Sequence, residues 1–293
     1  MRNARALPWF VPLILVVGLL YVYPVLDVVR LSFTNAGLLH PGYQYTLRSY
    51  VDMLRTGDLG QTLWITIVFV FFSVVFQLLL GFFISLAIIA GEQLKLRGTV
   101  VVRTAVLAAW AMPGVMIGII WRMLMDESPS GILNFLLSKV GIGHVAFLSS
   151  PSVALVSVIV ANIWRGTAFS MIMQYAGLKT IPDELYEAAK VDGATSWRRL
   201  VHITVPMMAP LLMVNLILIT ISTFNTFDMI MALTGGGPGR ATEVMALSIY
   251  DRIFHTYELG GGAAMAVVLL VINLLMAWVY MRMSRRTEGM TTS

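Results

Sequence analysis

Long apolar stretches, separated by short polar loops, dominate the hydrophobic pattern of this chain. Each stretch is near or above the ~20 residues that a helix needs to cross the hydrocarbon of a bilayer. Inside lipid every backbone polar group needs an internal hydrogen-bond partner, so we expect each stretch to be a helix. The pattern therefore predicts an all-α polytopic membrane protein, a single transmembrane domain over residues 1–293, with six spans at about 7–33, 61–90, 101–125, 151–177, 207–233 and 263–283.

The composition agrees with a bilayer as the solvent. Hydrophobic residues make up 58% of the chain, charged residues make up 12%, and the mean hydropathy is +0.82. The absence of cysteine excludes disulfides, thiolate metal sites and cysteine nucleophiles. Four scattered histidines do not suggest a metal centre. The net charge of +5 is weak evidence for nucleic-acid binding, and the distribution of that charge points elsewhere.

Basic residues fall mainly on one side of the expected membrane. With the amino terminus in the cytoplasm, twelve lysines and arginines lie inside and seven lie outside, with Arg165 left within a span. The positive-inside rule favours this orientation. We therefore expect both termini and the 178–206 loop to be cytoplasmic.

That loop has the pattern of two short helices joined by a turn. Pro182 suits the first turn of a helix, because its missing N–H would be unpaired there, and the acidic Asp183 and Glu184 complement the positive helix end. Gly193 permits a backbone conformation that other residues resist. A second helix is expected at 195–204, and Pro206 is expected to close the unit.

The same loop resembles the Glu-Ala-Ala motif of the permease subunits of binding-protein-dependent ATP-binding-cassette importers. The motif reads Glu-Ala-Ala, three residues, Gly, nine residues, Ile-x-Leu-Pro, and its positions here are Glu187, Ala188, Ala189, Gly193, Ile203 and Pro206, with Val205 in place of Leu. The resemblance implies that a partner ATPase is coupled to the membrane through Glu187, Ala188, Ala189, Asp192 and Gly193. Without it, the segment would be an ordinary amphipathic loop.

Polar residues interrupt the fourth span on one helical face. Asn162, Arg165, Gly166, Phe169 and Met173 recur at three- and four-residue steps. A charge near mid-membrane costs at least ~2.5–3.5 kcal/mol, so Arg165 is expected to face a wet cavity or a partner group. Two functions fit this face. Polar donors beside an aromatic ring suit a sugar, whereas Asn162 and Arg165 could equally bond to neighbouring helices.

The resemblance extends to this region and favours the first alternative. In maltose-type permeases the corresponding helices line the sugar path, which places Asn162, Gly166, Phe169 and Thr223 at matching positions. Ile219 stands where the larger maltose-type subunit has a small polar residue, which leaves the sugar open. The candidate substrate-path residues are Asn162, Trp164, Arg165, Gly166, Phe169, Thr223 and Asn225. We interpret Gln77 as an interhelical hydrogen-bonding residue and Trp110 as a weaker candidate.

The loop at 233–238 breaks the chain after the fifth span. Its Thr-Gly-Gly-Gly-Pro sequence resembles the corresponding segment of the larger maltose-type subunit, although it also fits a flexible turn.

No motif for catalysis is present. The sequence lacks G-x-x-x-x-G-K-[ST], H-E-x-x-H and G-x-S-x-G. We therefore expect a transport subunit that is not an enzyme and holds no cofactor, with ATP and magnesium on partner ATPase subunits.

Taken with the resemblance, these features imply one permease subunit of a carbohydrate importer in a bacterial or archaeal cytoplasmic membrane. The implied partners are a second, homologous permease, two ATPase subunits and an external solute-binding protein, and the implied mechanism is alternating access. One alternative is import of a charged carbohydrate such as a uronate or a glycerol phosphate, with Arg165 as counter-charge. Another is a stand-alone secondary carrier, which the lack of paired acidic residues in mid-membrane disfavours.

Overall fold

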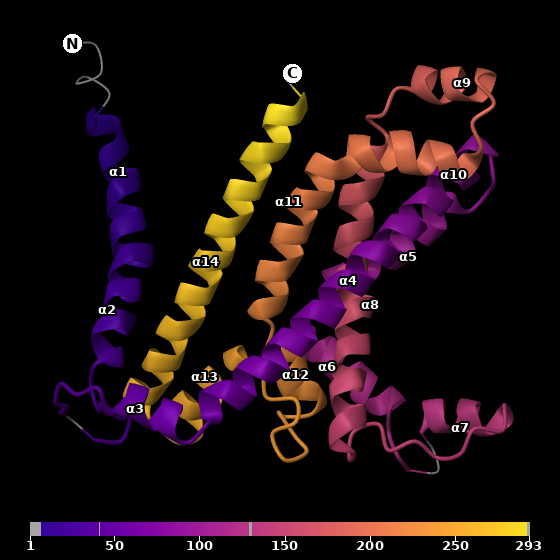
Figure 1. The fold of residues 1–293 in the computed structure, drawn as a ribbon. Coiled ribbons are helices and arrows are strands. Elements are labelled where there is room, and N and C mark those ends of the chain that lie inside the picture. The colour runs from indigo at the N-terminus through magenta and orange to yellow at the C-terminus, as the bar shows by residue number, and fades with distance from the viewer. Residues whose placement is uncertain (1–6, 41, 129–130, 292–293) are drawn as a thin grey trace. The chain divides into compact units, whose positions relative to one another are not determined.

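The computed structural model describes residues 7–40, 42–128 and 131–291, and it describes side chains over residues 10–40, 42–128 and 131–282. Within these ranges the regular structure is helical, apart from one isolated antiparallel bridge between Thr34 and Tyr45 (Figure 1). The all-α prediction is confirmed.

Five helical segments in the described part of the chain are long and apolar enough to cross a membrane, and the number is six if a bent pair of helices counts as one span. Three of the five match expected spans closely, namely Phe10–Ser32, Asp58–Gln93 and Leu259–Arg282. A fourth, Pro151–Leu178, matches the expected span at 151–177. The remaining two expected spans differ from their predicted form.

The chain divides into two compact units, one formed by Met1–Leu63 with Ser248–Ile272 and the other by Trp64–Leu247 with Asn273–Ser293. The first unit begins with α1 (Leu7–Val17), a π-helical turn η2 (Gly18–Val22) and α2 (Tyr23–Ser32), followed by α3 (Arg48–Arg55). It also contains most of α13 (Met245–Phe254) and the beginning of α14 (Leu259–Thr291).

Within this first unit the loop after α2 packs on the start of α14. The amide of Gly260 donates to the carbonyl of Ala36 at 2.8 Å. A Cβ at Gly260 would lie 2.1 Å from the carbonyl oxygen of Thr34, so only glycine allows this approach.

The second unit contains most of α4 (Asp58–Gln93) and both sites described below. Its other elements are α5 (Thr99–Ala111), α6 (Gly114–Leu124), α7 (Ile132–Lys139), α8 (Pro151–Leu178), α9 (Asp183–Val191), α10 (Ser196–Arg199), η3 (Leu200–Thr204), α11 (Val205–Phe224) and α12 (Asp228–Leu233). Figure 1 shows α9 and α10 near one end of α8 and α7 near its other end.

The expected span at 101–125 is two helices, α5 and α6, bent by 106° at Met112 and Pro113. The residue before a proline avoids the α region. Met112 accordingly adopts an extended conformation, with φ −78° and ψ 135°, and Pro113 follows at ψ 141°. Because Pro113 also lacks an N–H to continue the helical ladder, α5 ends at Ala111 and α6 restarts at Gly114.

The expected span at 207–233 is displaced toward the amino terminus, and Pro206 does not close the preceding unit. A helical segment runs from Ser196 to Phe224, with η3 inside it. In η3 the amide of Val205 bonds to the carbonyl of Leu200, five residues back. Pro206 follows this turn near the start of α11, where its missing N–H costs least. After Phe224 the chain leaves the helix and returns as the short helix α12.

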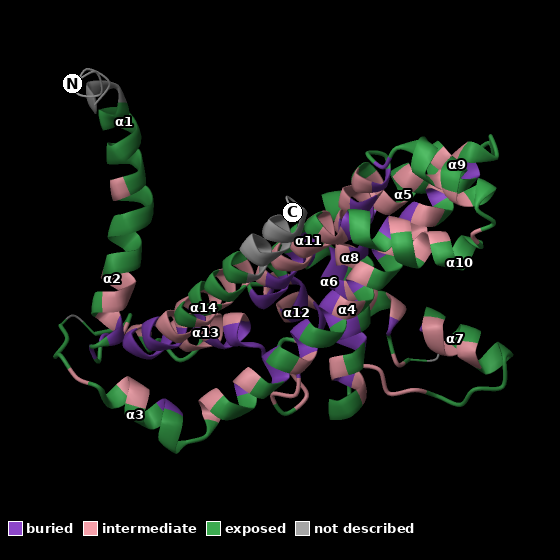
Figure 2. Ribbon diagram, turned by 45° about the horizontal axis from the view of Figure 1, so that its top comes forward, coloured by how far each residue is buried: buried purple, intermediate pink, exposed green. Residues whose placement is uncertain are grey.

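Small residues let the helices of the second unit approach closely. A Cβ at Gly81 on α4 would lie 2.8 Å from the amide nitrogen of Met171 on α8. A Cβ at Gly118 on α6 would lie 2.5 Å from the carbonyl oxygen of Met229 on α12. Such contacts are typical of helices that associate in lipid, where apolar surface alone gives little drive. Much of α12 is accordingly buried (Figure 2).

Candidate functional site

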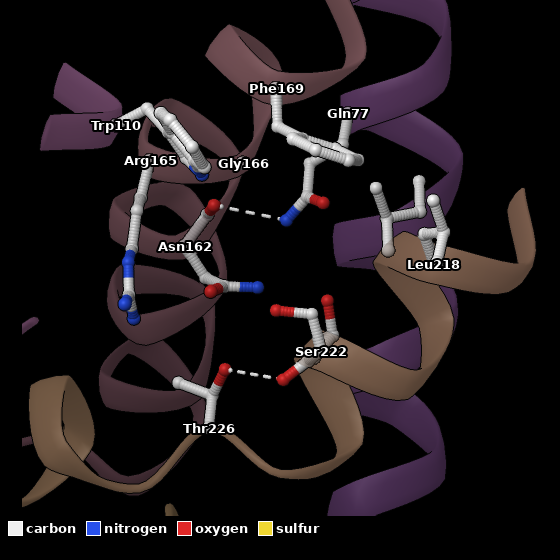
Figure 3. A pocket seen from close by; sticks show the side chains of 11 residues that line it. Gln77, Trp110, Asn162, Arg165, Gly166, Phe169, Leu218, Ser222 and Thr226 are labelled. Carbon is white, nitrogen blue, oxygen red and sulfur yellow. Dashed lines mark hydrogen bonds between the residues drawn. The ribbon is translucent and has the colours of Figure 1, made fainter. Parts of the chain in front are cut away.

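A cavity of about 290 Å³ lies among the membrane-spanning helices of the second unit (Figure 3). Its volume is close to the lower end of the ~300–1,000 Å³ typical of ligand pockets. Helices α4, α5, α8 and α11 contribute its wall, together with the residues that follow α11. The lining residues are Gln77, Trp110, Asn162, Arg165, Gly166, Phe169, Leu218, Ile219, Ser222, Thr223 and Thr226.

Most of the face of α8 predicted from the three- and four-residue spacing lines this cavity, whereas Met173, on the same predicted face, is not among the lining residues. Asn162, Arg165, Gly166 and Phe169 all contribute to it, and Thr223 of α11 joins them. The structure thus brings together five of the seven candidate substrate-path residues.

Trp164 and Asn225 do not line the cavity. On a helix, residue 164 points about 100° away from residue 165. Trp164 is 41% exposed and packs edge-to-face on Trp121, with 6.2 Å between ring centroids. Asn225 caps the C-terminus of α11, where its side-chain amide donates to the carbonyl of Ile221 at 2.7 Å. We therefore exclude Trp164 and Asn225 from the candidate site.

Gln77 joins the site although we interpreted it only as an interhelical bridge. Its amide nitrogen donates to the backbone carbonyl of Asn162 at 3.0 Å, and its side chain lines the cavity. Gly166 leaves room for this side chain, since a Cβ there would lie 2.3 Å from the Gln77 amide carbon. The sequence shows only a glutamine within a membrane span. Such a residue fits an interhelical hydrogen bond and a cavity wall equally well.

Asn162 presents a donor at the cavity wall. Its side-chain nitrogen is buried and has no hydrogen-bond acceptor among the described residues. Figure 3 shows this amide on the side of α8 that faces α11 and Ser222. A buried donor of this kind costs free energy unless an acceptor reaches it, so it is suited to a ligand oxygen.

Two aromatic rings form another part of the wall. Trp110 and Phe169 have ring centroids 6.0 Å apart and planes inclined by 35°. Trp110 ends up here because it lies one residue before the end of α5 at the bend. Aromatic faces beside hydrogen-bonding groups can pack on the C–H face of a sugar while its hydroxyls are satisfied at the edges.

Hydroxyl groups from α11 and the turn after it complete the cavity. Ser222 and Thr223 lie in the last turn of α11, and Thr226 follows, with its hydroxyl donating to the carbonyl of Ser222 at 3.0 Å. Ser222 and Thr226 were not among the sequence candidates, because nothing in the local pattern separates them from hydroxyls that merely bond to their own helix.

Arg165 is paired within the membrane. Its Nη1 lies 3.5 Å from Oδ1 of Asp228, the first residue of α12. The two side chains are 29% and 34% exposed. We expected Arg165 to face a cavity or a partner group, and it does both. The sequence analysis did not identify Asp228 as the partner.

The second candidate site is the loop that carries the Glu-Ala-Ala motif. Glu187, Ala188 and Ala189 lie on α9, and Asp192 is its C-cap. Gly193 has φ +73°, its amide bonds to the carbonyl of Lys190, and the amide of Ala194 bonds to the carbonyl of Ala189. This is a Schellman ending, in which a left-handed residue terminates the helix, so Gly193 has the conformational role expected for it.

The loop is held to the membrane helices by a small core and one hydrogen bond. Leu178, Ile181 and Met208 are buried together, and partly buried residues from α4, α9 and α11 pack around them. The hydroxyl of Tyr186 on α9 lies 2.9 Å from that of Thr204 in η3. These contacts join α9 to the adjacent ends of α8 and α11.

The outer side of the same loop is exposed, as Figure 2 shows for α9. Glu187, Ala188, Asp192 and Gly193 are exposed, and Ala189 is half-buried. Val191 is 88% exposed.

A charged cluster joins α4 and α8 next to this loop. Nζ of Lys179, the C-cap of α8, lies 2.6 Å from Oε2 of Glu92. The hydroxyl of Tyr175 donates to Oε1 of the same carboxylate at 2.7 Å. The hydrogen bond to Glu92 holds the pKa of Lys179 above its ordinary value. No sequence signal marked this cluster, because its members are far apart in the chain.

The described residues contain no group of three or more histidine, aspartate or glutamate side chains arranged to hold a metal ion.

The chain is similar to known membrane transport proteins. The family model described as "Binding-protein-dependent transport system inner membrane component" matches residues 83–289. The trehalose/maltose transport system permease protein MalF of Thermococcus litoralis is 34% identical over 275 residues, covering 94% of this chain and 91% of that protein. The sulfoquinovosyl glycerol transport system permease protein SmoG of Agrobacterium fabrum is 32% identical over 279 residues, covering 94% and 89%.

A solved structure shares the fold. A chain of a bacterial ABC transporter involved in the import of the acidic polysaccharide alginate aligns with a TM-score of 0.81, covering 97% of this chain and 96% of that chain, at 23% identity. The chain therefore belongs to the family of inner membrane components of binding-protein-dependent transport systems, which are permease subunits of ABC importers and leave ATP hydrolysis to a separate subunit.

Proposed function

We propose that this chain is one of two permease subunits in an importer that moves a carbohydrate across the cytoplasmic membrane. The observation that supports this most is the cavity between α8 and α11. It combines the paired rings of Trp110 and Phe169 with the amides of Gln77 and Asn162. Rings and amides at one wall suit a ligand that has C–H faces and hydroxyl edges.

Transport in this proposal is driven from the α9 loop. A partner ATPase docks on the exposed residues Glu187, Ala188 and Asp192, where a carboxylate can accept a charge-assisted hydrogen bond from a basic group. Gly193 sets the direction in which the chain leaves α9. Closure of the ATPases then moves α9, and with it α8 and α11, so that the cavity opens alternately to either side.

The proposed assembly contains this chain, a second homologous permease, two ATPase subunits that hold ATP and magnesium, and an external solute-binding protein. The dependence on a binding protein follows the family, whereas the number of each subunit is part of the proposal. In this arrangement both termini and the α9 loop face the cytoplasm.

The alternative of a charged carbohydrate, a uronate or a glycerol phosphate, rested on Arg165 as a free counter-charge. The ion pair with Asp228 makes that reading weaker. The alternative of a stand-alone secondary carrier drops out with the family assignment.

The test is uptake of radiolabelled trehalose and maltose into vesicles that contain the complete complex. We expect uptake to require ATP, the ATPase subunits and the binding protein. Phe169→Leu should raise the KM for uptake roughly threefold to tenfold by removing a ring from the sugar contact.

The matched control is Phe71→Leu, because Phe71 lies on α4 with 61% of its surface exposed and does not line the cavity. We expect this variant to transport with the native KM. Uptake without the ATPase subunits would overturn the proposed mechanism. Failure of every carbohydrate tested would overturn the proposed substrate class.

A further inference from the structure

Arg165 is the only charged side chain among the described residues that line the cavity. An unpaired guanidinium in a partly dry site binds carboxylates, sulfonates and phosphates well, because its planar donors match two anionic oxygens. Here Nη1 of Arg165 instead lies 3.5 Å from Oδ1 of Asp228, which does not itself line the cavity. The charge of the site therefore depends on a residue behind its wall.

The position of Asp228 is set by close packing between α12 and α6. Met229 and Ile230, the next two residues, are completely buried. A Cβ at Gly114 would lie 2.0 Å from Oδ2 of Asp228, so the carboxylate lies directly against the start of α6. The amino-terminal end of a helix is positive, which favours an anionic side chain there. The carboxylate is thus held in place by the backbone on one side and by Arg165 on the other.

We infer that Asp228 determines the charge specificity of the site, so that the cavity takes neutral carbohydrates and rejects anionic ones. An anionic sugar that approached Arg165 would have to displace a carboxylate fixed by packing, or bind beside it and be repelled. A neutral sugar meets no such repulsion. This inference rests on the proposed function, since it names the substrate class of the same cavity.

The test is binding of matched sugars to the purified complex of permease and ATPase subunits in nanodiscs, without the external binding protein. Only the membrane site then selects. The probes are radiolabelled trehalose and maltose and the uronate derivative of each, in which one primary hydroxyl is oxidised to a carboxylate. The readout is the ratio of uronate affinity to parent-sugar affinity, which cancels changes that affect both probes equally.

In Asp228→Asn the amide keeps the shape of the side chain and loses its charge. We expect the ratio of uronate affinity to parent-sugar affinity to rise by at least about tenfold. The uronate carboxylate can then bond to the unpaired Arg165, and a hydrogen bond to a charged group typically raises affinity by that factor. Asp228→Glu, which keeps the charge, should stay nearer to the native ratio. The double variant Arg165→Gln with Asp228→Asn should show an affinity ratio close to the native one, since both charges have been removed.

Arg165→Gln supplies a test that does not depend on assembly of Asp228→Asn. It leaves the carboxylate without its cation, so the ratio should fall below the native value. An unchanged ratio in Arg165→Gln, or in an Asp228→Asn complex that binds trehalose or maltose, would overturn the inference and leave the carbohydrate site intact. A native complex that prefers the uronates would do the same. If the native complex binds none of the four probes, the proposed function fails, and this inference fails with it.

Discussion

Gln77 of α4 donates its side-chain amide to the backbone carbonyl of Asn162 on α8, with 3.0 Å between nitrogen and oxygen. The side chain can reach that carbonyl because Gly166, one turn further along α8, leaves room for it. One glycine therefore gives Gln77 its position in the cavity wall.

Gly166→Ala should lower sugar uptake without preventing assembly. The added methyl would lie 2.3 Å from the Gln77 amide carbon, so this flexible side chain moves and its bond to Asn162 is lost. We expect the KM for uptake to rise by up to about tenfold, the worth of one buried hydrogen bond. In a Gln77→Ala background the same substitution should have little further effect. An equal loss of uptake in both backgrounds would contradict the coupling between these residues.

Gly193→Val should strongly reduce binding-protein-stimulated ATP hydrolysis and uptake. A β-branched residue at φ +73° is strained by roughly 1–2 kcal/mol, which favours a different course of the chain after α9. Apart from the glycine and its two chain neighbours, no atom of the described chain lies within 4 Å of a Cβ built at this position, so the effect expected within the subunit is conformational.

Gly193→Asn is the matched control, because asparagine tolerates positive φ. It should keep a larger share of both activities than Gly193→Val. If Gly193→Val assembles and transports at the native rate, the loop does not couple ATP hydrolysis to transport. If both variants lose activity equally, the side chain itself blocks a partner.

Glu127 should make the extramembrane segment after α6 sensitive to acid. Burial alone would raise the pKa of Glu127, but hydrogen bonds from the Ser149 hydroxyl and from the amides of Leu148 and Ser149 lower it below its ordinary value of 4.5. A lowered pKa means that the carboxylate stabilises the fold above the unfolded value and that this contribution is lost as pH falls through the folded value. We therefore expect the native complex to lose thermal stability below about pH 4.5 more steeply than Glu127→Gln, measured as Tm against pH. Parallel profiles would contradict this role.

Two serine-to-cysteine variants test the topology, and the native chain has no cysteine to interfere. Ser196 begins α10, Ser138 lies on α7, and both are exposed. In intact cells, a membrane-impermeant thiol reagent should label Ser138→Cys and spare Ser196→Cys until the membrane is opened. The reverse pattern would place the α9 loop outside.

The membrane-spanning helices could be predicted because length and apolar character suffice for a helix in lipid. The bend between α5 and α6 and the end of α11 at Phe224 could not be predicted in this way. Pro113 ends α5, whereas Pro206 and Pro210 are accommodated near the start of α11 and within it. The difference depends on the tertiary contacts of each segment, which hydropathy does not record.

Some features of the candidate site could likewise be predicted from local sequence, and others depend on tertiary packing. The residues of α8 that line the cavity follow from helical spacing, and the Schellman turn at Gly193 follows from a glycine after a short amphipathic helix. The pair of Arg165 and Asp228 spans 63 residues and depends on how α12 packs on α6, so no local pattern reveals it. Trp164, next to Arg165 in the sequence, packs on Trp121 and does not line the cavity.

The most direct test of the account asks whether the cavity between α8 and α11 is the path of the sugar. Ser222 lines the cavity and differs from cysteine by one atom, whereas Asn225, three residues later, is exposed and lies outside it. Each is replaced by cysteine in the complete complex, and the rate of modification by a small thiol reagent is measured with and without a saturating transported sugar. The account predicts that the sugar slows modification of Ser222→Cys severalfold and leaves Asn225→Cys unaffected. Equal rates at Ser222→Cys with and without the sugar, in a complex that still transports it, would contradict the account.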